Sequence, residues 1–213
     1  MNAIVTDKSF VTMFSGLYVF IVVLYLIFHK KPTNKPKYAW WIKPFSVLHY
    51  TILACISVHM FIGMGYSWYT ICAEKGFDLC MNLHASNVLN TQHSTNAAIE
   101  FWQGASAYYM YVFAISKYYE FVDTFIMMAK SYDIIFLHWW HHCTVPVLMI
   151  IHTTEHSSSV WTGSWFNCLV HTIMYSYYGI TAMGFSLKSV KSLITTLQLI
   201  QFITVLGHVS YLY

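Results

Sequence analysis

The chain has 213 residues, of which 57% are hydrophobic and only 9% are charged, whereas a soluble domain has about 25% charged residues. The polar side chains are too few to coat a soluble globule, so we expect lipid to cover part of the surface. The formal net charge of +3 is too small to favour a nucleic-acid partner. The five cysteines form no CxxC pair, which disfavours a zinc or thioredoxin-like site.

Six apolar segments are candidates for helices that cross a bilayer, which takes about 20 residues. We expect them at 10–28, 46–66, 98–126, 134–151, 160–183 and 190–212. The first is too long for the core of a signal peptide and lacks a cleavage site, so we interpret it as a retained span. An open sheet would leave backbone groups unpaired in lipid. The prediction is therefore an all-α, polytopic membrane helix bundle that forms one domain over 1–213.

Lysine positions predict the orientation of this bundle. Lysines crowd the first loop and recur in or beside the third and fifth loops, at Lys130, Lys188 and Lys191. By the positive-inside rule these loops are cytosolic, so the N-terminus and the loop 67–97 are lumenal. Cys72 and Cys80 lie in that loop, where a disulfide could form. The sixth span would end on the lumenal side directly after apolar residues, and we therefore expect a further segment.

The third predicted helix ends in a polar cluster of Lys117, Glu120, Asp123 and Thr124. Spacings of i, i+3 and i+7 place Lys117, Glu120 and Thr124 on one face. Charged groups at membrane depth are costly and usually serve chemistry. The alternative is an ion-paired cluster near the headgroups, with Lys117 extending toward the interface.

The fourth predicted helix carries His138, His141 and His142 on one face, one turn apart. Three imidazoles so placed could bind a metal or supply a nucleophile and a base. An isolated histidine is usually a satisfied structural group, but three within five residues at membrane depth favour a functional site. We expect Pro146, just after them, to kink the helix and open this site.

The fifth predicted helix carries a polar stripe at spacings of four, four and three, made of Asn167, His171, Tyr175 and Tyr178. Tyrosines alone would suggest an interfacial belt, but a belt does not need Asn and His beneath it.

The last predicted helix carries Gln198 and Gln201 after Thr195. Two buried amides can join helices by hydrogen bonds, or they can line a polar tunnel. The sequence leaves both interpretations open.

Together these four patterns resemble the ELO family of very-long-chain fatty acid elongases. The family signatures KxxExxDT, HxxHH, NxxxHxxMYxYY and TxxQxxQ occur in that order at 117–124, 138–142, 167–178 and 195–201. HxxHH alone would be weak, since desaturases and hydroxylases share it. The resemblance extends from the lysine-rich first loop to about residue 212. It implies a 3-oxoacyl-CoA synthase, a multi-pass enzyme of the endoplasmic reticulum membrane that condenses a long acyl-CoA with malonyl-CoA and releases carbon dioxide and CoA.

The resemblance also implies a seven-helix bundle that encloses an acyl tunnel closed on the lumenal side. Six of these helices are expected here, and on this resemblance we expect the sequence to be truncated before the seventh helix and its basic tail. The substrates acyl-CoA and malonyl-CoA would need no cofactor and no metal. The implied partners are membrane lipid and the reductases and dehydratase of the elongation cycle. Acyl chain length and oligomeric state, a homo-oligomer included, are left open, although Met149, Trp165 and Phe166 are candidates for the tunnel floor.

The same resemblance implies roles for individual residues. His141 would form an acyl-imidazole, since imidazole can accept an acyl group from a thioester. His171 and Asn167 would position or stabilise malonyl-CoA as it decarboxylates. The residues expected to orient His141 are His138, His142 and Asp123. The residues expected to bind substrate are Lys117, Glu120, Thr124, Tyr175, Tyr178, Gln198 and Gln201.

Three alternatives remain. Cys143 or Cys168 could be the nucleophile, although buried cysteine is more often an apolar filler. A di-iron oxygenase, encouraged by the HxxxH spacing of His152 and His156, would need more ligands than one HxxHH box supplies. A lipid transporter would use the polar core as a path without chemistry.

Overall fold

The computed structural model describes residues 7–29, 38–76, 104–154 and 160–212. Every regular element within those ranges is a helix, which confirms the all-α class. The helices are α2 (Lys8–Phe28), α3 (Ile42–Lys75), α6 (Gly104–Tyr119), α7 (Phe121–Ala129), α8 (Phe136–Thr154), α9 (Val160–Met183) and α10 (Lys188–Leu212).

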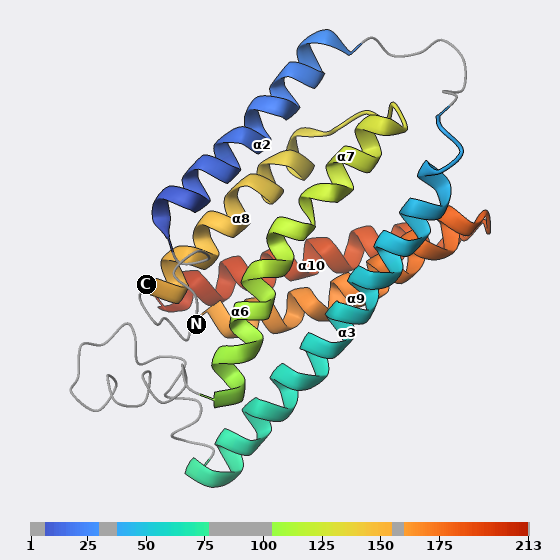
Figure 1. The fold of residues 1–213 in the computed structure, drawn as a ribbon. Coiled ribbons are helices and arrows are strands. Elements are labelled where there is room, and N and C mark those ends of the chain that lie inside the picture. The colour runs from blue at the N-terminus through green and yellow to red at the C-terminus, as the bar shows by residue number, and fades with distance from the viewer. Residues whose placement is uncertain (1–6, 30–37, 77–103, 155–159, 213) are drawn as a thin grey trace.

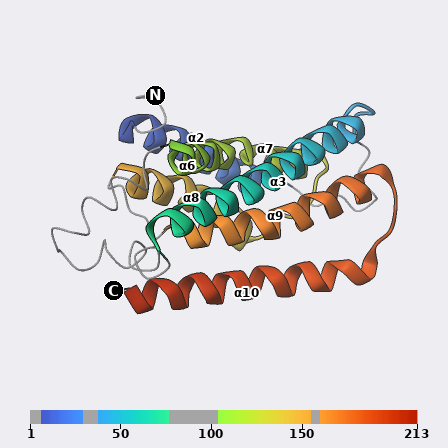
Figure 2. The ribbon, with the colours of Figure 1, turned by 90° about the horizontal axis from the view of Figure 1, so that it is seen from below.

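The helices form a bundle in which α9 occupies a central position. Helix α3 packs along α9 in the most extensive contact of the bundle, and α2 lies beside α8 (Figure 1). Helices α6 and α7 follow one another almost in line (Figure 1). Helix α10 lies on the outside against α9 (Figure 2).

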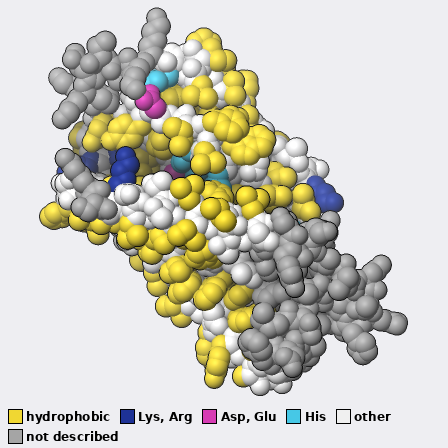
Figure 3. Space-filling view, turned by 180° about the vertical axis from the view of Figure 1, so that it is seen from behind, with side chains coloured by type: hydrophobic (Ala, Val, Ile, Leu, Met, Phe, Trp, Pro, Cys, Tyr) yellow, Lys and Arg dark blue, Asp and Glu magenta, His cyan; other side chains and the backbone are white. Residues whose placement is uncertain are grey.

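Much of the surface is apolar, as a membrane protein requires. Figure 3 shows hydrophobic side chains over a large part of one face. On α2, Met13, Phe20 and Ile27 are all more than half exposed. Among the described residues, three helices are long and apolar enough to cross a membrane, namely α2, α3 over Ile42–Glu74 and α10 over Val190–Gly207. The chain is therefore a helical membrane protein, and the count of six spans stays a prediction.

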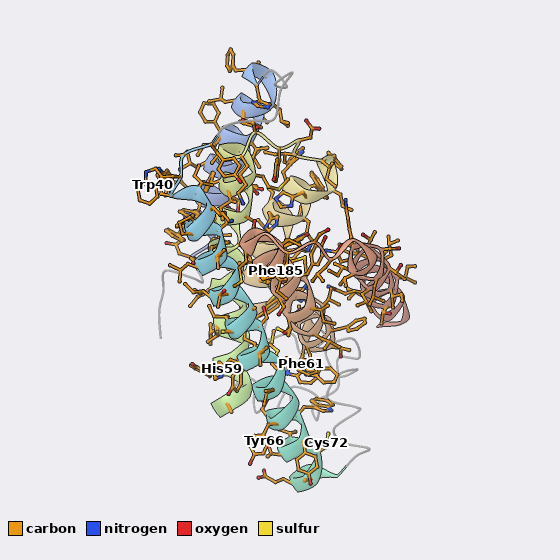
Figure 4. The ribbon with its side chains drawn as sticks, turned by 90° about the vertical axis from the view of Figure 1, so that its right-hand side faces the viewer. Trp40, His59, Phe61, Tyr66, Cys72 and Phe185 are labelled. Carbon is orange, nitrogen blue, oxygen red and sulfur yellow. The ribbon has the colours of Figure 1, made fainter. Side chains whose placement is uncertain are left out.

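Helix α3 is longer than expected, because it begins at Ile42 and ends at Lys75 rather than spanning 46–66. In its last turns, the hydroxyls of Ser67 and Thr70 are satisfied by carbonyls three residues back. Trp40 and Cys72 mark its two ends in Figure 4. The placement of Cys72 in a loop was therefore wrong: it lies in the last turn of α3 and is disulfide-bonded. Cys80 lies outside the described residues.

The expected helix 98–126 is two helices, with a break at Glu120 and an end at Ala129; residues 98–103 lie outside the described ranges. Just before the break, the Ser116 hydroxyl donates to the carbonyl of Phe113 at 2.8 Å. Such back-bonding competes with the helical ladder and bends helices. The amide of Asp123 then bonds the Glu120 carbonyl three residues back, so the chain tightens for one turn.

Helix α8 runs through Pro146 as one helix. Because proline has no N–H, the carbonyl of His142, four residues earlier, loses its helical donor.

The start of α3, the α7–α8 connection and the α9–α10 turn lie at one end of the bundle (Figure 1). The Lys130 ammonium lies 6.0 Å from the ring centroids of Tyr38 and of Tyr50. Lys43 reaches Gly184 in the α9–α10 turn. Burial lowers the pKa of the Lys130 ammonium from its ordinary value, because desolvation disfavours its charged form. Lys43 and Lys130 thus lie at one end, and the side of the membrane that this end faces stays a prediction.

Candidate active site

The centre of the polar site is the first turn of α7 together with the residue before it. We call Glu120, Asp123 and Thr124 the α7 turn. Each of its three side chains lies against a histidine from a different helix. The pairs are Glu120 with His171 of α9, Asp123 with His49 of α3, and Thr124 with His138 of α8.

Glu120 belongs to a closed network with Lys117, Asn167 and His171. The Lys117 ammonium donates to Glu120 Oε1 and to Asn167 Oδ1, both at 2.7 Å. His171 Nδ1 lies 3.3 Å from Glu120 Oε1, and His171 Nε2 lies 3.1 Å from Asn167 Nδ2. All four side chains are buried. We call these four residues the lysine network.

The contacts of the lysine network fix where its hydrogens lie. A carboxylate only accepts, so His171 carries its hydrogen on Nδ1, and its Nε2 accepts from the Asn167 amide. Both ring nitrogens of His171 are therefore engaged. The Lys117 ammonium also lies 4.3 Å from the centroid of the Phe113 ring. Lys117 is 2% exposed, so it points into the bundle and does not extend toward the headgroups.

The Asp123 carboxylate has different partners from those expected. His49 Nε2 donates to its Oδ1 at 2.7 Å, and the Tyr175 hydroxyl donates to its Oδ2 at 2.8 Å. Asp123 therefore makes no direct hydrogen bond to His141, the residue that it was expected to orient. Sequence reasoning missed His49, which belongs to none of the four patterns. The available signal was an imidazole within an apolar helix at membrane depth.

The Thr124 hydroxyl lies between two helices. It is 2.8 Å from His138 Nε2 and 2.9 Å from the hydroxyl of Tyr18 on α2. The Tyr18 ring stacks on Phe121, with centroids 4.2 Å apart. We call His138, His141 and His142 the histidine box. Helix α2 thus supports the histidine box through Tyr18, a second residue that the sequence patterns did not indicate.

Hydrogen bonds fix only one of the three histidines of the box. The rings of His138 and His142 are 4.4 Å apart, and those of His141 and His142 are 5.5 Å apart. Among the described residues, neither His141 nor His142 makes a side-chain hydrogen bond, whereas His138 bonds Thr124. His142 is buried, but His141 is partly exposed and lies against Phe202 of α10. Of the three imidazoles of the box, His141 is therefore the one that is partly exposed and also makes no side-chain hydrogen bond within the described residues.

Within the described residues, Gln198, Gln201 and Tyr178 make no hydrogen bond to Glu120 or Asp123. Gln198 Nε2 is 3.2 Å from Met174 Sδ, which joins α10 to α9 as the structural alternative predicted. Gln201 is buried. The Tyr178 ring packs against Tyr50.

The positions of Cys143 and Cys168 agree with their interpretation as apolar packing residues. Cys168 is 1% exposed in the core cluster that also holds Met60 and Met110, and Cys143 packs near Tyr18. Within the part of the chain that the structure describes, no three His, Cys, Asp or Glu side chains are grouped to hold a metal ion.

The described surface includes two depressions. One of about 450 Å³ lies on α3 beside Lys43 and Thr51, and a groove of about 150 Å³ lies between α2 and α6–α7 beside Tyr18 and Tyr118. Neither is lined by the histidine box. The acyl tunnel therefore stays a prediction, although Figure 3 shows histidine and acidic atoms between the hydrophobic side chains of one face.

Fold and site define a helical membrane protein with a buried cluster of histidines, carboxylates and one lysine. The model of the GNS1/SUR4 family, ELO, matches residues 4–213, and the chain belongs to this family. The chain is 33% identical to fatty acid elongase sre1 of Dictyostelium discoideum over 210 residues, which cover 96% of this chain and 70% of that protein.

Shorter matches point the same way. The chain is 40% identical to fatty acid elongase A of Dictyostelium discoideum over 93 residues, 44% of this chain and 34% of that protein. It is 34% identical to long chain fatty acid elongase 1 of Caenorhabditis elegans over 118 residues, 53% of this chain and 41% of that protein. No solved structure matches the chain significantly.

Proposed function

We propose that this protein is a 3-oxoacyl-CoA synthase of the endoplasmic reticulum membrane, which condenses a long-chain acyl-CoA with malonyl-CoA. Membership of the elongase family supports this, and so do the names of the relatives. The observation that carries the mechanism is the contrast between His141, partly exposed and without a hydrogen-bond partner among the described residues, and the fully engaged His171.

In the first half-reaction, one ring nitrogen of His141 attacks the thioester carbonyl. A carbon–nitrogen bond forms and the carbon–sulfur bond breaks. The leaving CoA thiolate takes the hydrogen that the other ring nitrogen releases, so the products are a neutral acyl-imidazole and CoA. Splitting one difficult step into two in this way is the general advantage of covalent catalysis.

In the second half-reaction, malonyl-CoA loses carbon dioxide, and the electron pair left on carbon attacks the acyl group. The new carbon–carbon bond forms as the carbon–nitrogen bond to His141 breaks, and the imidazole takes up one proton. The overall reaction consumes one proton and releases 3-oxoacyl-CoA, carbon dioxide and CoA. No redox cofactor is needed for this balance.

Asn167 is suited to the charge that develops during decarboxylation. An amide group carries two N–H hydrogens, and Asn167 uses one of them on His171. The second can donate to the thioester oxygen of malonyl-CoA as it becomes an enolate. Lys117 holds the Asn167 carbonyl oxygen and so fixes which side of the amide presents its N–H groups.

The test is the intact mass of the detergent-purified protein after incubation with a long acyl-CoA alone. We expect a mass increase of one acyl group, which malonyl-CoA then discharges as 3-oxoacyl-CoA. The adduct must disappear in His141→Ala and persist in His59→Ala, an exposed histidine on α3 outside the site.

Three results would contradict the proposal. An acyl adduct that remains in His141→Ala would place the nucleophile elsewhere, and Cys143 or Cys168 would be examined next. Iron in the purified protein without an adduct would favour an oxygenase. Acyl-CoA movement across vesicles without any condensation product would favour a transporter.

A further inference from the structure

We propose that His49 is a positioning residue of this site: it holds the Asp123 carboxylate and thereby fixes the α7 turn, whose other two side chains align His171 and His138. The expected change in kcat rests on the proposed function. The expected change in histidine modification rests on the geometry alone.

The His49–Asp123 contact is short, buried and charge-assisted. The distance from His49 Nε2 to Asp123 Oδ1 is 2.7 Å, and the two residues are 1% and 6% exposed. Hydrogen bonds to an ionised acceptor are about twice as strong as neutral ones. Because the carboxylate only accepts, the hydrogen lies on His49 Nε2. His49 Nδ1 is buried without a partner among the described residues, so a second hydrogen there would have no acceptor.

Asp123 depends on its two neutral donors more than Glu120 does. The charge of Glu120 is balanced by the Lys117 ammonium 2.7 Å away. Asp123 has no lysine partner in the part of the chain that the structure describes, and its two oxygens accept from His49 and Tyr175. Removing His49 would leave Asp123 Oδ1 buried without a donor, and the desolvation penalty of an unsatisfied charged oxygen favours a rearrangement that brings it a new donor.

The position of Asp123 in the chain turns such a local rearrangement into an effect on the whole site. Asp123 lies three residues after Glu120 and next to Thr124, in the first turn of a helix of nine residues. The break at Glu120 separates this helix from α6, so the turn is not stiffened by a long continuous helix. A shift of Asp123 therefore moves the carboxylate that holds His171 and the hydroxyl that holds His138 together.

Two amides distinguish this role from simple packing. In His49→Gln the side-chain amide nitrogen reaches the place of His49 Nε2 and can donate to Asp123. In His49→Asn the amide is one methylene shorter and cannot reach. Both variants are polar and neutral, and they differ by one methylene, which decides whether the amide reaches Asp123. The matched control is His59→Asn, on the same helix and on the opposite side from Phe61 in Figure 4.

The kinetic experiment measures kcat and KM for malonyl-CoA in the full chain. Because misplacement of about 1 Å can cost about 100-fold, we expect His49→Asn to lower kcat about 10- to 100-fold with little change in KM. We expect His49→Gln to recover most of this loss, and His59→Asn to behave as the wild type. Equal kcat values in His49→Asn and His49→Gln, whether both are normal or both are low, would overturn the proposal.

A second experiment does not need activity. Diethyl pyrocarbonate modifies accessible imidazoles, and peptide mass spectrometry identifies the modified residues. In the wild type we expect modification of His141 but little of His138 and His171, which are hydrogen-bonded. In His49→Asn the modification of His138 and His171 should rise together, and in His49→Gln it should stay low.

The two experiments separate the two proposals. If the wild type condenses nothing but the modification pattern is as expected, the proposed function fails and the positioning role stands. If modification of His138 and His171 is the same in all variants, the positioning role fails whatever the activity. Should His49→Asn not fold, His49→Met, an apolar side chain of similar length without a donor, must give the same rise in modification.

Discussion

The two ends of the bundle interior are built in opposite ways. Around the α7 turn, most polar atoms have one specified partner at 2.7 to 3.3 Å. Beyond it lies an apolar core in which Met60, Met64, Met110 and Met149 pack with Phe113 and Trp161. Methionine side chains are flexible and tolerate substitution. Under the proposed function, the chemistry would take place at the polar end, which allows one arrangement, and a bound acyl chain would extend into the methionine-rich core, which can repack.

The largest effect should come from breaking the ion pair at the polar end. In Lys117→Met the buried Glu120 carboxylate loses its counter-charge, and breaking a buried pair in this way costs about 3–5 kcal/mol. Thermal unfolding in detergent should show a much lower Tm, with loss of activity. The double variant Lys117→Met with Glu120→Leu should regain most of the stability but no activity. A double variant as unstable as the single one would show that the unpaired Glu120 charge is not the cause of the instability.

The next effect separates the two half-reactions. Asn167→Ala removes the proposed donor to the enolate oxygen and leaves His141 in place. Loss of one such donor costs about 100- to 1000-fold in kcat. We expect the acyl adduct to form at a near-normal extent in Asn167→Ala and its discharge by malonyl-CoA to slow by that factor, followed by intact mass over time. Slow formation with fast discharge would reverse the assignment.

A smaller effect on stability, but a visible one on product, is expected at the apolar end. Val145 and Met149 follow His141 at four-residue intervals on α8, so a chain on His141 that extends away from the polar cluster meets them in turn. Met149→Phe should cost about 1–3 kcal/mol through overpacking and shorten the longest product. Gas chromatography of the products checks this against Leu148→Phe, whose side chain is exposed and should leave product length unchanged.

The smallest effect concerns the close contact of α3 with α9. A Cβ on Gly65 would lie 3.3 Å from Trp165 Nε1, an atom fixed by its hydrogen bond to the Phe61 carbonyl. A Cβ on Gly16 would meet nothing within 4 Å. Since alanine favours a helix over glycine by about 0.5–1 kcal/mol, Gly16→Ala should raise the Tm slightly and Gly65→Ala should lower it. If both raise it, Trp165 is free to move and does not close the apolar end.

Much of the site's composition could be predicted from the sequence, but its connections could not. The bounds of α9 were predicted correctly at 160–183, and the residues of the α7 turn were all identified as polar at membrane depth. Spacing along one helix does not reveal that Lys117 bonds Asn167 on another helix, because that contact depends on how the helices pack. His49 and Tyr18 were missed for the same reason, because each is a single residue whose role depends on its hydrogen-bond partner on α7. The break at Glu120 is also invisible in the pattern, since it needs no glycine or proline.

The α7 turn has a consequence for how the protein is made. Its three side chains need partners from α3, which is synthesised earlier, and from α8 and α9, which emerge later. During synthesis, which proceeds from the N-terminus, Asp123 meets His49 first, while Lys117 and Glu120 have only each other until Asn167 and His171 enter the membrane. A chain stalled before α9 is inserted therefore carries an incompletely solvated ion pair within the bilayer. The insertion of α9 brings Asn167 and His171 to this ion pair and completes the lysine network.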